Sequence, residues 1–104
     1  MGLITHETLI ITDWKFSAVE LLHLRACDIF LSKRVSSIVE SAYNGYYTFI
    51  IGPDCSKTGP QWEEDIKPYT EARKKFYKEA KALGIKVWKA SYGEDMQRPK
   101  IYKK

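Results

Sequence analysis

The fold of this chain is decided by one stretch, which reads Asn44-Gly45-Tyr46-Tyr47-Thr48-Phe49-Ile50-Ile51. Asn and Gly tolerate positive φ at the centre of a two-residue turn, so this pair indicates a β-hairpin. The β-branched and aromatic run that follows predicts a strand over 46–51, which Gly52-Pro53 ends. What precedes the turn decides how large the sheet is.

Two alternatives are open for the residues before the turn. Val35, Ile38, Val39 and Ala42 have the spacing of one helix face, in which case Gly45 caps a helix. The same segment is rich in Ser and β-branched residues, which is typical of a strand. We predict the strand because Asn-Gly is a strong hairpin signal. The sequence alone leaves 34–43 undecided between strand and helix.

The rest of the chain alternates between strand and helix patterns. Glu7–Thr12 predicts a strand, and apolar residues at helical spacing predict a helix over Phe16–Phe30. Pro68 is tolerated in a first helical turn, so we expect a second helix over 68–83, ended by Gly84. Ile85–Tyr92 predicts a last strand.

This order, β-α-β-β-α-β, predicts an α+β fold, specifically a ferredoxin-like two-layer sandwich with an antiparallel sheet and both helices on one face. We expect 1–104 to be a single domain, because 104 residues with 44% hydrophobic and 29% charged side chains match an ordinary globular domain. Residues 52–67 are expected to form a loop. Residues 95–104 are expected to form a polar, basic tail with a short extra strand near Ile101.

Composition also bears on location. The chain has no run of about 20 apolar residues, which is the length that spans a bilayer, so we expect no membrane association. Its first residues lack the basic and apolar regions of a signal peptide, and the two Cys are expected to be reduced thiols. We therefore predict a cytoplasmic protein.

Charge is distributed unevenly along the chain. Residues 1–66 contain five Lys or Arg against nine Asp or Glu, whereas residues 67–104 contain twelve against four. Such asymmetry indicates a contact surface for phosphate or for an acidic protein. The alternative is a solvated helix face followed by a basic tail.

No pattern predicts catalysis. The loop 52–58 differs from a phosphate-binding P-loop, because Ser56 stands before Lys57 where that motif needs Gly. The acidic runs 63–65 and 94–95 lack a second feature that would make them acid–base partners. We predict no cofactor and no catalytic residue.

The His and Cys residues supply the donor types of a zinc site without its spacing. His23 and Cys27 are four residues apart on the expected helix, but His6 and Cys55 would have to come from separate segments. We therefore predict no metal. Whether Cys27 and Cys55 have a function is left open.

In the second half of the chain, the run 49–57 contains Pro53-Asp54-Cys55-Ser56-Lys57, Gly59 and Trp62 follow it, and Trp88 is followed by 92–95, Tyr-Gly-Glu-Asp. In these motifs the chain resembles a group of small proteins encoded by bacteriophages. The resemblance implies a viral origin and implies no chemistry.

Our leading hypothesis is a small, non-catalytic viral accessory protein that binds and modulates a host protein. The alternative is a nucleic-acid-binding module that uses the basic C-terminal half, and a small enzyme is a third interpretation. A homodimer through exposed strand edges is also open. The candidate binding surface combines basic and aromatic residues, namely Lys57, Trp62, Lys86, Trp88, Lys89, Tyr92, Lys100, Tyr102, Lys103 and Lys104.

Overall fold

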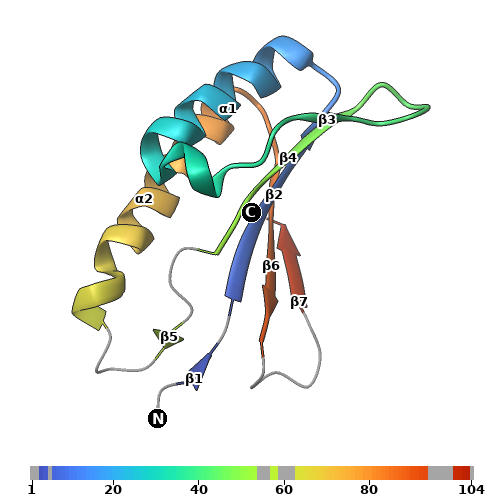
Figure 1. Cartoon of the computed structure of the whole chain (residues 1–104). Coiled ribbons are helices and arrows are strands. Elements are labelled where there is room, and N and C mark those ends of the chain that lie inside the picture. The colour runs from blue at the N-terminus through green and yellow to red at the C-terminus, as the bar shows by residue number, and fades with distance from the viewer. Residues whose placement is uncertain (1–2, 5, 54–56, 59–62, 94–99, 104) are drawn as a thin grey trace.

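The computed structural model describes residues 3–4, 6–53, 57–58, 63–93 and 100–103 (Figure 1). The main sheet has five antiparallel strands in the order β3-β4-β2-β6-β7, and a separate two-stranded pair joins β1 to β5. The elements in chain order are β1 (Leu3–Ile4), β2 (His6–Asp13), α1 (Phe16–Phe30), a 3₁₀ turn (Ser32–Arg34), β3 (Val39–Glu40), β4 (Tyr47–Ile51), β5 (Lys57–Thr58), α2 (Glu63–Ala82), β6 (Val87–Tyr92) and β7 (Lys100–Lys103).

The arrangement is α+β, as expected, and is compatible with a two-layer sandwich. Figure 1 shows α1 and α2 on the same side of the main sheet. The strands predicted over 7–12, 46–51 and 85–92 are present as β2, β4 and β6. The short extra strand expected near Ile101 is β7. Within the described ranges, neither helix has the length and apolarity needed to cross a bilayer.

The hairpin around Gly45 is confirmed, although its first strand is short. Val39 pairs with Thr48, and the Ser41 N–H donates to the Tyr46 carbonyl at 2.8 Å. The turn therefore spans residues 42–45 rather than the two residues that we expected, and only Gly45 of the Asn-Gly pair has a positive φ, of 69°. The strand is short because Ser36 interrupts the ladder: its N–H donates to the Ile50 carbonyl, but its hydroxyl oxygen, rather than its carbonyl, accepts the Ile50 N–H at 2.8 Å. A side chain thus replaces the backbone acceptor of a regular strand.

The start of α2 corrects our expectation. We expected a loop up to residue 67 and a helix from Pro68, but α2 begins at Glu63 and contains Pro68 in its interior. The acidic run 63–65 therefore occupies the first helical turn, where the helix dipole favours negative charge. Pro68 costs α2 the hydrogen bond to the carbonyl of Glu64, and the helix continues through it.

The core lies between the helices and one face of the sheet. The rings of Phe30 and Phe76 meet edge to face with centroids 5.5 Å apart, which joins α1 to α2. An ion pair of 2.9 Å between Arg25 and Glu79 links the same helices at their surface. The buried apolar residues are Leu9, Ile11, Val19, Leu22, Ala26, Phe30, Phe49, Ile51, Phe76, Ala80, Ile85 and Val87.

Candidate functional site

The second face of the sheet is covered by no helix in the described part of the chain. Side chains alternate along a strand, so when Leu9 and Ile11 face the helices, Ile10 faces away from them. In β4 the same alternation places Ile51 in the core and Ile50 on the other side. We call the side away from the helices the uncovered face.

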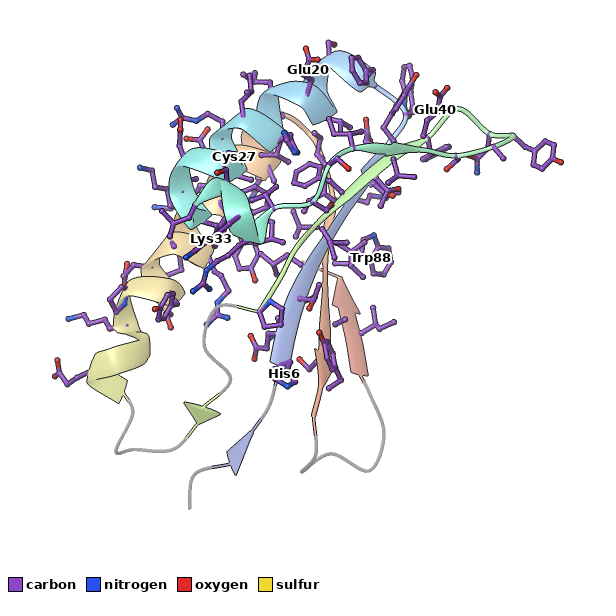
Figure 2. All side chains as sticks on the ribbon, viewed as in Figure 1. His6, Glu20, Cys27, Lys33, Glu40 and Trp88 are labelled. Carbon is purple, nitrogen blue, oxygen red and sulfur yellow. The ribbon has the colours of Figure 1, made fainter. Side chains whose placement is uncertain are left out.

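The uncovered face is largely apolar. Ile50 is 41% exposed and pairs across the sheet with Ile10, which in turn pairs with Trp88. Figure 2 shows Trp88 on the opposite side of the sheet from Cys27 of α1. Clustered exposed apolar side chains indicate an interaction site. The large exposed apolar side chains on or beside this face are Val39, Tyr46, Ile50, Trp88, Tyr92 and Ile101.

The polar groups of this face bond to one another. The hydroxyls of Thr12 and Thr48 form a cross-strand hydrogen bond. The hydroxyls of Thr8 and Tyr92 are 2.8 Å apart, and the Tyr92 ring lies 5.3 Å from the ring of His6. Because these hydroxyls already have partners, the surface offered to solvent is mainly the apolar side chains around them.

A hollow of about 350 Å³ opens at one end of the uncovered face. We call it the aromatic hollow, because three exposed aromatic rings line it. Trp88 belongs both to this hollow and to the uncovered face. The residues that line the hollow are Thr12, Asp13, Trp14, Tyr46, Gly84, Lys86 and Trp88.

Three connections bring the lining residues together: the one between β2 and α1, the β3–β4 hairpin that carries Tyr46, and the one between α2 and β6. The Asp13 carboxylate accepts the Lys15 N–H at 3.0 Å, which turns the chain from β2 into α1 and leaves Trp14 60% exposed. At the end of α2, Gly84 has a φ of 71° and its N–H donates to the Lys81 carbonyl at 3.0 Å. This is the helix end that Gly84 predicts, and it places Lys86 directly before β6.

The structure brings together only part of the predicted binding surface. Lys86 and Trp88 line one hollow, and Tyr92 lies further along the same face. Lys89 lies on the face that the helices cover, where its Nζ is 3.6 Å from the Oε1 atom of Glu7. Arg73 of α2 contacts the second oxygen of Glu7 at 3.3 Å. Lys89 thus belongs to an ion-pair group between sheet and helix.

The other residues of the predicted binding surface have side chains that lie outside the described part of the structure. Lys57 lies in β5, and three more lie in β7, but their side chains are outside the described residues. Trp62 and Lys104 lie outside the described residues altogether, as do 54–56, 59 and 94–95, which carry much of the resemblance. The three residues in β7 are Lys100, Tyr102 and Lys103.

The described His and Cys residues do not converge. Figure 2 shows His6 at the far end of β2 from Cys27. The Nε2 of His23 lies 2.8 Å from the Ser36 carbonyl, and its ring packs edge-on against Phe49. Cys27 is a half-buried free thiol, and Cys55 lies outside the described residues. Among the described residues no group of three potential ligands could hold a metal.

The described lysines of the basic half lie mainly on α2. Lys74, Lys75, Lys78 and Lys81 are exposed on this helix, which covers the opposite side of the sheet. Lys74 is also 3.9 Å from Glu71, one turn away. This arrangement fits the solvated helix face that we considered as the alternative explanation of the charge asymmetry.

Several residues of the site were absent from the predicted binding surface: Trp14, Val39, Tyr46, Ile50 and Ile101. One signal for Ile50 was present in the sequence. The run 46–51 is apolar at nearly every position, whereas a strand with one wet face alternates apolar and polar residues. A run with so little alternation indicates that both faces of the strand carry apolar groups.

Comparisons of this chain with protein-family models, with curated proteins and with solved structures found no match. A proposal about function therefore rests on the uncovered face and the aromatic hollow. The described side chains of the uncovered face are chiefly apolar, and three aromatic rings line the hollow together with Thr12, Asp13, Gly84 and Lys86.

Proposed function

We propose that this chain is a non-catalytic interaction protein that binds and modulates another protein through the uncovered face. The observation that carries the proposal is Ile50, which is exposed in mid-sheet between strands that supply further apolar groups. Aromatic and apolar side chains of this kind form the centre of protein interfaces, where burial removes them from water.

The distribution of charge supports a protein partner. A polynucleotide needs a row of cations that follows its phosphates. The described centre of the uncovered face is uncharged, with Ile10, Ile50 and Ala90 on three neighbouring strands. Lys89 is turned to the other face and paired with Glu7. An apolar protein surface complements such a face better than a phosphate backbone does.

The finer fold assignment belongs to the same proposal. The strand order β6-β2-β4-β3, with α1 after β2 and α2 after β4, supports a ferredoxin-like arrangement to which β7 adds an edge strand. The resemblance to phage-encoded proteins supports a host protein as the partner and the host cytoplasm as the compartment. A homodimer through a strand edge stays a prediction.

Nucleic-acid binding is the second candidate function. It is favoured by Trp88 and Tyr92, two exposed aromatic rings on one sheet face, with Lys86 beside the first of them. Aromatic side chains on an open antiparallel sheet stack on bases in RNA-binding domains.

One experiment separates the two candidates. The tagged chain and its Ile50→Lys variant are used to capture partners from a bacterial lysate, with and without nuclease. Leu24→Lys is the matched control, because Leu24 is an exposed apolar residue of α1 and the added charge is the same. We expect to capture a protein whose binding is unaffected by nuclease, is retained by the wild type and the control, and is lost with Ile50→Lys.

The contrary outcome concerns the added cation, which weakens an apolar interface but strengthens phosphate binding. Tighter, nuclease-sensitive binding by Ile50→Lys would therefore replace this proposal with the second candidate.

A further inference from the structure

We propose that the aromatic hollow binds a single nucleotide, whose base stacks on the exposed rings and whose phosphate meets the ammonium groups beside them. This ligand site goes beyond the protein-binding function proposed above. The hollow shares Tyr46 and Trp88 with the uncovered face, but Ile50, which carries the protein-binding proposal, does not line it. The ligand class is a nucleobase with at least one phosphate, either free or at an accessible position of a single strand.

The first observation is the convergence of three rings from separate segments. Trp14 is 60% exposed, Tyr46 39% and Trp88 36%, although large aromatic side chains contribute most when buried. All three line one concavity of about 350 Å³, which lies at the small end of the range for small-molecule sites. Base stacking on such rings tolerates any base, because every base has a π-face.

The second observation is the sign of the charges beside the rings. Lys86 lines the hollow, and the Nζ of Lys15 lies 5.3 Å from the centre of the Trp14 ring. Two ammonium groups next to an aromatic surface match a ligand that joins a base to a phosphate. With the Asp13 carboxylate in the lining, the two lysines still leave one net positive charge at the hollow, which disfavours the cationic ligand that an aromatic hollow would otherwise attract.

The third observation is the carboxylate of Asp13 in the lining. Its Oδ2 accepts the Lys15 N–H, so the carboxylate is held at the wall of the hollow by the backbone. A carboxylate accepts hydrogen bonds from exocyclic amino groups such as N4 of cytosine. We therefore expect bases with an amino group to bind more tightly than uracil, which has none.

The test is a titration of the ¹⁵N-labelled chain with CMP, GMP and UMP at low salt, followed by NMR and by calorimetry. We expect the indole N–H signals of Trp14 and Trp88 to shift on titration, and CMP and GMP to bind more tightly than UMP. A parallel titration with a short single-stranded oligonucleotide distinguishes the two sources of the ligand. Equal affinity per site indicates a free nucleotide, and a clear gain with the oligonucleotide indicates a strand.

Matched variants locate the site. Tyr46→Ala is expected to weaken binding about tenfold, whereas Tyr43→Ala, at a fully exposed ring on the same hairpin, is expected to leave it unchanged. Lys86→Gln is expected to weaken binding and to reduce its salt dependence, with Lys78→Gln on α2 as the control. The folding of each variant is checked by circular dichroism.

Two results would overturn the proposal: no binding of any of these ligands at low salt, or equal losses in the variants and their controls. Ile50→Lys keeps this test separate from the proposed function. If both proposals hold, this variant loses the protein partner and retains nucleotide binding.

Discussion

Both faces of the sheet carry isoleucines, but in opposite environments. On β4, Ile51 is 2% exposed beneath the helices, whereas its neighbour Ile50 is 41% exposed on the uncovered face. Ile11 and Ile10 repeat the contrast on β2. The comparison shows that apolar character on a strand identifies a buried face only when a second layer covers it.

The polar groups differ between the faces as well. The covered face places the ion-pair group of Glu7, Arg73 and Lys89 at its edge, joining β2, β6 and α2. The polar pairs described on the uncovered face are neutral hydroxyls, Thr12 with Thr48 and Thr8 with Tyr92. Each difference predicts a measurable effect.

The largest expected effect is the loss of a core side chain. Ile51→Ala should lower the free energy of unfolding by about 2–5 kcal/mol, because it removes buried area and leaves a cavity. Ile50→Ala should cost less than about 1 kcal/mol, because Ile50 is partly hydrated in the folded state. Urea denaturation of both variants measures the difference. Equal losses would mean that the uncovered face is covered in solution, and a loss that depends on protein concentration would point to a dimer.

The next effect concerns binding. Trp88→Ala should weaken capture of the proposed protein partner tenfold or more, since truncated aromatic anchors commonly cost 2 kcal/mol or more at an interface. The quantity measured is the partner retained at a series of concentrations of immobilised protein. Leu24→Ala on the exposed surface of α1 serves as the control. Unchanged binding by the Trp88 variant would remove this face from the interface.

A smaller effect is expected from the ion-pair group. Glu7→Gln should reduce stability by about 1 kcal/mol at low salt and by less at high salt, because salt screens the lost interactions. Glu71→Gln is the control, as Glu71 is well exposed and its partner Lys74 lies 3.9 Å away. Denaturation at two ionic strengths checks the prediction. A loss independent of salt would show that Glu7 acts through packing or hydrogen bonding.

The smallest effect is expected at the hydroxyl pair. Thr48→Val removes the bond to Thr12 but keeps a β-branched side chain on the strand. A cross-strand Thr pair contributes about 0.2–1 kcal/mol, so the variant should lose no more than that. A thermal melt is sufficient to measure it. A loss above 2 kcal/mol would show that the uncovered face is more constrained than an exposed surface.

Local chemistry made much of this fold predictable. The Asn-Gly pair indicated the hairpin, apolar spacing indicated α1, and Gly84 indicated the end of α2. The predictions were wrong where an interaction outside the local pattern changed the limits of an element. Pro68 suggested a helix start, but the acidic run before it extends the helix to Glu63. The hydroxyl of Ser36 replaced a backbone acceptor and shortened β3.

The candidate site was less predictable than the fold. Trp88, Lys89 and Tyr92 belong to the predicted binding surface because each is basic or aromatic, yet strand alternation puts Lys89 on the other face. Trp14 is missing from the predicted surface, because nothing near it in sequence indicates that Tyr46 and Trp88 are its neighbours.

The sequence by itself determined the types and approximate limits of most elements, because helix periodicity, strand propensity and turn chemistry act between residues a few positions apart. Only the tertiary structure decided which sheet face the helices cover and which rings share the hollow. Those outcomes depend on strand register and layer packing between residues as distant as Trp14 and Trp88. The free energy that stabilises this register and packing comes from burial of the whole core, so no single segment of the sequence predicts it.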